Sequence, residues 1–334
     1  MIPGSGSAVP GRARLGPAGD TVYFAGSAVA SPLLVPRNGM PGFAPESAVA
    51  RLMLPLSCFH PTAETKIMII EWNTHLFSRD VESYPLHPRA AYRPRMEEKP
   101  ADPLSEYLER MQTESIDRAV VVQPEPYGDD HRLILECLER EPDKLWGTSL
   151  FYPDDADAPD KLADLVAAQP RIVSTRFHAH RGKTMYLDSF AATGVRRLWQ
   201  RAVDLGLIVE LHIGPDYAVQ VAEVLRDLPE STVLIDHLAE PHKGNAVEYA
   251  QVLELAAFPR VYMKLSGLNH FATDAPLYTS ARAFTRIVIN AFGPQRMVWG
   301  SGTPAIVDAH MEDYDTPARN RVKGGNLALL LQDQ

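Results

Sequence analysis

A repeating alternation of short apolar runs and helical segments is the feature that most restricts the fold of this 334-residue chain. From residue 67 onward, each run is rich in β-branched residues and is followed by a segment with helical periodicity. The apolar runs cover residues 67–71, 117–123, 145–151, 171–178, 207–212, 232–237, 261–266 and 296–300. The helical segments cover about 102–115, 131–139, 160–168, 195–205, 217–228, 246–257 and 276–292, with a closing stretch to about 331.

Eight strand–helix units over about 265 residues are typical of a parallel α/β fold of the (β/α)8 TIM-barrel type. An open doubly wound sheet has a similar alternation, but its first strand normally leads into a Gly-rich phosphate-binding turn. No such turn follows residues 67–71. The sequence therefore predicts a TIM barrel over residues 67–334.

The first sixty-six residues have a different composition from the rest of the chain. They are rich in Gly, Pro, Ala and Ser, and they show neither strand nor helix periodicity for long. A basic, mildly apolar stretch near Arg12 and Arg14 lacks the compact hydrophobic segment and cleavage site of a targeting signal. We expect residues 1–66 to form a disordered or loosely packed extension.

Composition excludes several classes of partner. A net charge of −9 without a basic patch argues against nucleic acid, and no apolar stretch reaches the length of a membrane span. The two cysteines, Cys58 and Cys137, lack metal-ligand spacing, which predicts free thiols and a cytoplasmic location. An anionic small molecule would need a local cluster of cations in so acidic a chain. A homo-oligomer is compatible with the sequence.

Polar side chains gather where the predicted strands end, which is where TIM barrels carry their chemistry. Three imidazoles from three strands, His75, His212 and His237, are expected to meet there and to hold a divalent ion such as zinc or manganese. A metal-free site with a histidine base and cationic oxyanion stabilisers is the alternative. The period-2 spacing of Glu71, Asn73 and His75 predicts that all three lie on one side of the first strand. Other strand ends supply Arg176, His178, His180, Asp236, Lys264 and Ser266, whereas His87, His131, His242, His270 and His310 fall on predicted loops or helices and are given local hydrogen-bonding roles.

Several of these segments together resemble the amidohydrolase superfamily. The resemblance lies in Glu-Trp-Asn-Thr-His75, Val-Glu-Leu-His212, Leu-Ile-Asp-His237-Leu-Ala-Glu-Pro, Val-Tyr-Met-Lys-Leu-Ser-Gly267, Arg-Met-Val-Trp-Gly-Ser-Gly-Thr-Pro304 and Lys-Gly-Gly-Asn326. It runs from about Met68 to Leu331 and is similar to the amidohydrolase 2 branch of lactonases, decarboxylases and hydratases.

The resemblance also shows two departures from the family pattern. The family's first strand reads Asp-x-His-x-His, where this chain has Glu71, Asn73 and His75. The aspartate that ends the family's eighth strand and moves the proton falls on Gly302. Asparagine is a poor zinc ligand beside imidazole, and glycine has no group that could carry a proton. A replacement base would come from Glu71, Asp236, Glu240 or a histidine.

The resemblance implies a hydrolase that opens a lactone or similar cyclic ester of a carboxylate-bearing substrate. His75, His212, His237 and Glu71 would be catalytic. Substrate would be held by Asn73, Arg176, His178, Arg181 and Lys264. The alternatives are a decarboxylase or hydratase of the same branch, and a barrel that has lost catalysis and only binds a small ligand.

Overall fold

The computed structural model describes residues 67–179 and 186–332, and these residues form the predicted barrel. The predicted N-terminal extension, residues 1–66, lies outside the described residues, and so do His180 and Arg181.

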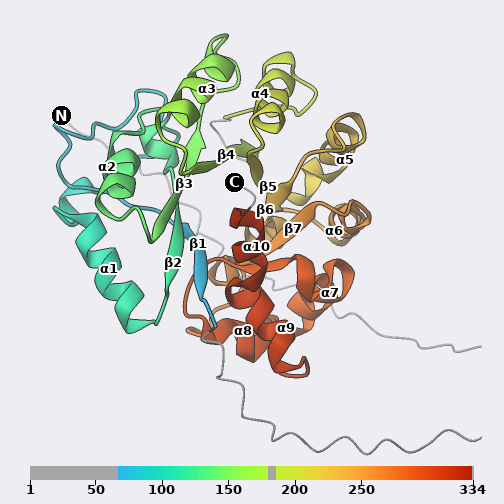
Figure 1. Ribbon diagram of the computed structural model, residues 1–334. Coiled ribbons are helices and arrows are strands. Elements are labelled where there is room, and N and C mark those ends of the chain that lie inside the picture. The colour runs from blue at the N-terminus through green and yellow to red at the C-terminus, as the bar shows by residue number, and fades with distance from the viewer. Residues whose placement is uncertain (1–66, 180–185, 333–334) are drawn as a thin grey trace, which may run out of the picture. The chain divides into compact units, whose positions relative to one another are not determined.

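Eight parallel strands pair in sequence order from β1 to β8, and β8 returns beside β1 to form a nearly closed TIM barrel (Figure 1). Each strand was located by the sequence to within a few residues, because a run of β-branched and apolar residues buried on both faces is characteristic of a parallel sheet. The strands are β1 (Ile70–Thr74), β2 (Arg118–Val122), β3 (Leu145–Leu150), β4 (Ile172–Ala179), β5 (Ile208–Ile213), β6 (Val233–Ile235), β7 (Val261–Leu265) and β8 (Met297–Trp299).

Helices surround the strands, and most of them pack an apolar face against the outside of the barrel (Figure 1). Among the described residues no helix combines the length and apolar character that crossing a bilayer requires. The main helices are α1 (Pro103–Thr113), α2 (Arg132–Arg140), α3 (Ala158–Ala168), α4 (Thr193–Asp204), α5 (Ala218–Asp227), α6 (Ala246–Glu254), α7 (Arg282–Phe292), α8 (Ala305–His310), α9 (Thr316–Asn320) and α10 (Asn326–Gln332).

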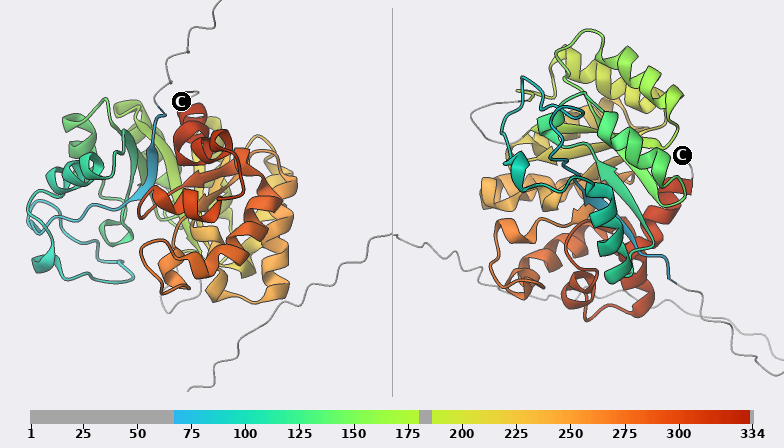
Figure 2. Two further views of the ribbon diagram at one scale, coloured as in Figure 1. Left: turned by 90° about the horizontal axis from the view of Figure 1, so that it is seen from below. Right: turned by 90° about the vertical axis from the view of Figure 1, so that its left-hand side faces the viewer.

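The barrel interior is closed at one end by α10. Leu327 and Leu331 of this helix join a buried cluster with inward residues of the strands, such as Ile70 and Val298. Asn326 fixes the start of the helix, because its Nδ2 donates to the carbonyls of Pro294 and Met297. The long segment between β1 and α1 lies at the opposite end of the barrel (Figure 2, right). That open end is where the chemistry of a TIM barrel is expected.

Helix α7 begins six residues later than the sequence predicts. The expected start was Pro276, but the helix starts at Arg282. The Asp274 carboxylate accepts hydrogen bonds from Thr279 Oγ1 and from the backbone N–H of Ser280, at 2.9 Å each. This side chain therefore stabilises a turn over residues that would otherwise continue the helix.

The His131 side chain links α2 to β3 and should make stability depend on pH. Its Nε2 accepts the backbone N–H of Leu150 at 3.1 Å, and burial lowers its pKa from 6.5 to about 4. The unfolded chain therefore takes up this proton at a higher pH than the folded chain does. Stability should fall by about 3 kcal/mol from this group as pH falls from 6.5 to 4.

Urea unfolding of wild type and His131→Leu at pH 7.5, 5.5 and 4.5 tests this dependence. At pH 7.5 the variant should be the less stable protein, since it lacks the hydrogen bond to Leu150. Between pH 6.5 and 4 the variant should lose less stability than wild type does. Equal losses in the two proteins would show that His131 does not control the acid response.

Candidate functional site

A cavity of about 260 Å³ opens at the end of the barrel opposite α10. It is small for a ligand pocket, so it suits a small compound. The walls are formed by residues at the ends of the strands and in the loops after β1, β2, β4, β6 and β7. The lining consists of His75, Ala91, Tyr92, Glu125, Arg176, His178, Tyr186, His212, His237 and His270.

A β-bulge in β1 overturns the prediction that Glu71, Asn73 and His75 share one side of the strand. Trp72 pairs with Val120 of β2 and Thr74 with Val121, so Asn73 is an extra residue in the ladder. Trp72 points into the barrel, where its Nε1 donates to Glu210 at 3.0 Å. The bulge changes the alternation after Asn73, which lets His75 reach the cavity while Glu71 points to the helix layer.

Glu71 consequently lies outside the imidazole cavity, although His75 borders both that cavity and the cleft beside Glu71. Its carboxylate accepts hydrogen bonds from Tyr107 Oη at 2.6 Å and from both terminal nitrogens of Arg110 at 2.8 and 3.0 Å. Arg110 Nη2 also donates to the carbonyl of Gly302 at 2.8 Å. These groups line a second, more open cleft of about 450 Å³ between β1, β8 and α1.

Replacing Glu71 with glutamine should affect stability more than turnover. The change removes the charge that pairs with Arg110 but leaves the cavity lining intact, so we expect a loss of about 1–3 kcal/mol in unfolding free energy. Turnover of a lactone substrate should stay within about threefold of wild type. Urea unfolding and initial-rate assays of the same preparations measure both quantities. A drop in turnover at unchanged stability would instead support the catalytic role that the sequence predicts for Glu71.

Asn73 and Gly302 lie on this second cleft and outside the lining of the imidazole cavity. The Asn73 Oδ1 atom is buried without a hydrogen-bond partner among residues 67–179 and 186–332. Gly302 adopts a φ of +79°, a left-handed conformation that favours glycine over aspartate. The two positions at which the chain departs from the family pattern are therefore neighbours in space.

His75 lines the cavity in its neutral form. Its Nδ1 donates to the carbonyl of Val122 at 3.0 Å, which leaves Nε2 as an acceptor that faces Arg176 Nη1 at 3.4 Å. Burial, and then the cation of Arg176, lowers the pKa of His75 to about 3. A guanidinium beside Nε2 makes this imidazole a poor ligand for a cation.

A left-handed turn at the end of β6 brings His237 and Glu240 to the cavity. Residues 237–240 have φ values of 50°, 54°, 57° and 48°, although none of the four is glycine. Side chains other than glycine adopt this conformation at a cost of about 1–2 kcal/mol per residue. The turn is held by Tyr249 Oη, which donates to the carbonyl of Leu238 at 2.8 Å. Strain at consecutive residues that carry polar groups is typical of a functional site.

His212, His237 and Glu240 form the donor group that could hold a metal ion. One ligand atom from each lies within 4.8 Å of the other two. His212 Nε2 is 2.8 Å from Glu240 Oε1, and His237 Nδ1 is 2.8 Å from Ser266 Oγ. Burial lowers the pKa of His237 to about 3, so its imidazole is neutral and able to bind an ion. Two imidazoles and a carboxylate are an established donor set for zinc.

The compact donor group differs in one member from the predicted metal set of His75, His212 and His237. His75 lines the same cavity, but Arg176 faces its Nε2 and it does not belong to the compact donor group. Glu240 takes its place. From the sequence, Glu240 was expected only as a candidate replacement base and not as a metal ligand.

Lys264 lies beneath the cavity floor and not at its surface. Its ammonium is fully buried and is held by Glu210 Oε1 at 2.8 Å and Asp236 Oδ1 at 2.5 Å. Arg176 also pairs with Asp236, through Nε at 2.9 Å and Nη2 at 2.5 Å, while its guanidinium remains part of the cavity lining. Burial alone would raise the pKa of Asp236, but the two cations hold it below its ordinary value. Arg176 can contact a substrate, and Lys264 cannot without leaving both carboxylates.

His178 reaches the cavity as predicted, with its Nδ1 3.3 Å from His212 Nδ1. Arg181, the other predicted anion ligand on this segment, lies outside the described residues.

Five cavity residues were not assigned to the site by sequence reasoning: Ala91, Tyr92, Glu125, Tyr186 and His270. His270 Nδ1 lies 2.9 Å from Glu240 Oε2, and its ring lies 5.2 Å from that of His237. Glu125 and Tyr186 come from loops that follow β2 and β4. A signal for Glu125 was present, since it is a carboxylate three residues beyond the end of a strand.

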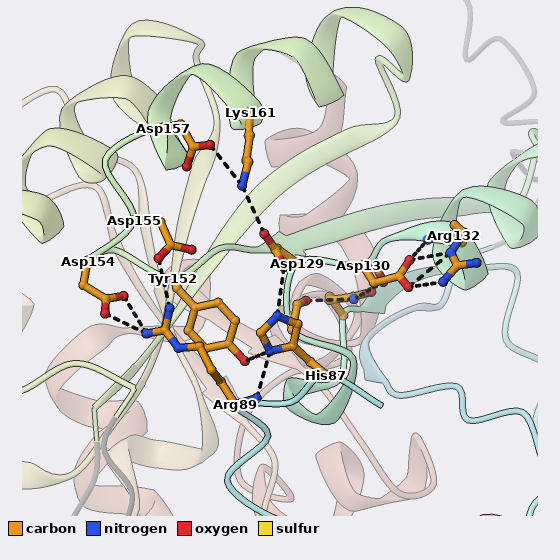
Figure 3. Close-up of polar contacts among 12 residues, drawn as sticks. His87, Arg89, Asp129, Asp130, Arg132, Tyr152, Asp154, Asp155, Asp157 and Lys161 are labelled. Carbon is orange, nitrogen blue, oxygen red and sulfur yellow. Dashed lines mark hydrogen bonds and ion pairs between the residues drawn. The ribbon is translucent and has the colours of Figure 1, made fainter. Parts of the chain in front are cut away.

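The segment from Ser78 to Ala101, called the cover segment below, covers part of the cavity through Ala91 and Tyr92. Its two ends meet where Arg79 N donates to the carbonyl of Pro100 at 3.0 Å. Its tip is fastened to the loop after β3: the Arg89 guanidinium lies over the Tyr152 ring and pairs with Asp154 and Asp155 (Figure 3).

Curated relatives of this chain are lactone hydrolases. A 4-sulfomuconolactone hydrolase of Hydrogenophaga intermedia is 26% identical over 266 residues, which cover 78% of this chain and 81% of the relative. An L-fucono-1,5-lactonase of Burkholderia ambifaria is 28% identical over 240 residues, which cover 63% of this chain and 78% of the relative.

Solved structures share the fold. A probable 2-pyrone-4,6-dicarboxylic acid hydrolase from Acinetobacter baumannii, with citric acid bound, superposes with a TM-score of 0.63 at 21% identity and covers 79% of this chain and 99% of its own. An amidohydrolase from Burkholderia multivorans with bound zinc gives 0.64 at 17% identity, with coverages of 79% and 99%. The amidohydrolase family model matches residues 70–321. The chain therefore belongs to the amidohydrolase family, in its amidohydrolase 2 branch.

Proposed function

We propose that this protein opens a lactone or similar cyclic ester that carries an anionic group. The observation that carries the proposal is one small cavity lined by Arg176 and the imidazoles of His75, His178, His212, His237 and His270. Lactone-hydrolysing relatives at 25–28% identity support the reaction class.

Arg176 would bind the anionic group or the developing oxyanion. Asp236 accepts from Nε and Nη2, and this fixes the guanidinium with Nη1 on the cavity side, beside His75. A donor held in place before the substrate arrives needs no reorganisation during the reaction. Because the chain carries a net charge of −9, an anionic substrate would be repelled by the protein as a whole. The buried cation of Arg176 would offset this repulsion inside the cavity.

The imidazoles would position water and the ester carbonyl. His237 is fixed by Ser266, and His212 lies between Glu240 and His178. His212, His237 and Glu240 would hold a divalent ion, zinc or manganese, which when bound polarises a carbonyl and lowers the pKa of a water. In the metal-free alternative, the imidazoles and Arg176 alone stabilise the oxyanion. Elemental analysis of protein purified without chelator decides between the two.

The function is tested with a panel of five- and six-membered lactones, with and without a carboxylate or sulfonate. We expect ring-opened hydroxy acid as the product, seen by chromatography, with the anionic lactones preferred. Release of carbon dioxide from an aromatic carboxylate would instead favour a decarboxylase. Tight binding without turnover of any ester would favour a barrel that only binds a ligand.

Location and assembly remain predictions. The buried free thiol of Cys137 is compatible with the reducing cytoplasm that we expect for this protein. A homo-oligomer is tested by light scattering after size exclusion.

A further inference from the structure

The proposed reaction needs a proton acceptor, and Gly302 stands where the family pattern places one. Five buried carboxylates lie at or near the open end of the barrel within the part of the chain that the structure describes. They are Glu71, Glu125, Glu210, Asp236 and Glu240. Their surroundings show which of them could exchange a proton with a substrate.

Four of the five are engaged by cations or imidazoles. Glu71 is bound by Arg110, on the side of β1 away from the imidazoles. Glu210 and Asp236 share Lys264 beneath the floor. Glu240 contacts three histidines: His212, His242 and His270. Each of these carboxylates would lose a charged or hydrogen-bonded partner if it became protonated.

Glu125 differs from all four. It lies in the short turn Glu125–Tyr127 after β2, is 7% exposed and forms part of the cavity wall. Its two oxygens accept the backbone N–H of Ala91 at 2.9 and 3.1 Å, and no ion pair involves it in the described ranges. It is a buried carboxylate with access to the cavity, and none of the cations among the described residues forms an ion pair with it.

The surroundings of Glu125 favour its role as a proton acceptor. Burial raises its pKa, and the Ala91 N–H only partly opposes this. Burial, and then the Glu125 carboxylate, raises the pKa of Tyr92 in the cover segment and of Tyr152 after β3. Arg176 and the imidazoles of His75, His178, His212, His237 and His270 form the rest of the cavity lining. A carboxylate with a raised pKa is a stronger base than an ordinary one, and in its protonated form it can return the proton.

We propose that Glu125 is the general base and acid of the lactone-opening reaction, in place of the aspartate that the family carries on strand 8. The inference rests on the proposed function. The Glu125 carboxylate takes a proton from water while the water oxygen forms a bond to the lactone carbonyl carbon. The ring C–O bond then breaks, and Glu125 returns the proton to the departing alkoxide. The products are the ring-opened hydroxy acid and an unchanged enzyme.

The test compares Glu125→Gln with wild type on the best lactone of the panel. Glutamine keeps the size of the side chain and an oxygen for the Ala91 N–H, so the variant should fold and its KM should change little. The turnover number should fall by about 10²–10⁴-fold. In wild type, kcat should rise with pH as Glu125 loses its proton, and this limb of the pH–rate profile should be absent in the variant.

Glu136→Gln is the matched control. Glu136 of α2 accepts a hydrogen bond from Tyr84 of the same cover segment, but it lies outside the cavity. This control should lose no more than about threefold in turnover and should keep the wild-type pH limb. Equal losses in the two variants would assign the effect to a loosened cover and overturn the proposal.

Two results separate this inference from the proposed function. An active wild type whose Glu125→Gln variant keeps more than about a third of the turnover, or keeps the pH limb, overturns the role of Glu125 alone. A wild type that opens no lactone of the panel rejects the proposed function, and this inference with it.

Discussion

Replacing Lys264 with methionine should lower the free energy of unfolding by about 3–5 kcal/mol. The ammonium is fully buried between Glu210 and Asp236, and methionine would fill much of the same space without the charge. Two carboxylates would then share the single cation of Arg176, which leaves one buried negative charge uncompensated. Urea unfolding at 25 °C measures the loss.

The pH dependence of this loss follows from Glu210. Burial and the neighbouring Asp236 already raise its pKa, and removing Lys264 would raise it further. A carboxyl whose folded pKa lies above its unfolded value destabilises the fold as pH rises through the unfolded value and on towards the folded one. The deficit of Lys264→Met should therefore be smaller at pH 5 than at pH 8.

Two variants complete the test. Lys264→Met with Glu210→Gln restores charge balance, and the amide can still accept from Trp72 Nε1, so about 2 kcal/mol or more should return. Lys144→Met breaks a solvent-exposed pair with Glu141 and should cost at most about 1 kcal/mol. A similar small cost at Lys264 would mean that water reaches the group.

The barrel could be predicted from the sequence because its signal is repeated and local. A strand such as residues 119–122 is apolar on both faces, and this pattern depends only on its own residues and on burial in a parallel sheet. The positions of the site residues depend instead on contacts between distant parts of the chain. The bulge at Asn73 leaves no trace in residue type, yet it decides that His75 reaches the cavity and that Glu71 does not.

The sequence also does not show which of the polar residues at the strand ends face the cavity. Arg176 and Lys264 both lie near strand ends and carry the same charge, but Arg176 lines the cavity and Lys264 lies beneath it. The left-handed turn that brings Glu240 beside His212 consists of residues without a special preference for positive φ, and so the sequence could not show it. Tertiary packing decides which side chains face the cavity and which backbone conformation the turn adopts. A single sequence does not show that packing.

Replacing His237 with alanine should reduce lactone turnover by about 10³-fold or more and should leave the barrel folded. His237 lines the cavity, and it belongs to the one compact donor group found in the described part of the chain. Its loss would remove a group that positions water or holds an ion, so the effect should fall on kcat/KM and on any bound metal together. Initial rates and elemental analysis of the same preparation measure both.

His310→Gln is the control for the loss of a buried histidine as such. His310 of α8 is fully buried between Thr285 Oγ1 and the carbonyl of Leu277, at 2.8 Å each, and it does not line the cavity. This variant should lose stability but keep turnover per folded molecule. If His237→Ala kept wild-type turnover while His310→Gln behaved as expected, the imidazole cavity would not be the site of chemistry. If His237→Ala lost turnover from a protein that never held metal, the imidazoles and Arg176 would act without an ion, because the chemistry would then depend on their hydrogen bonds alone.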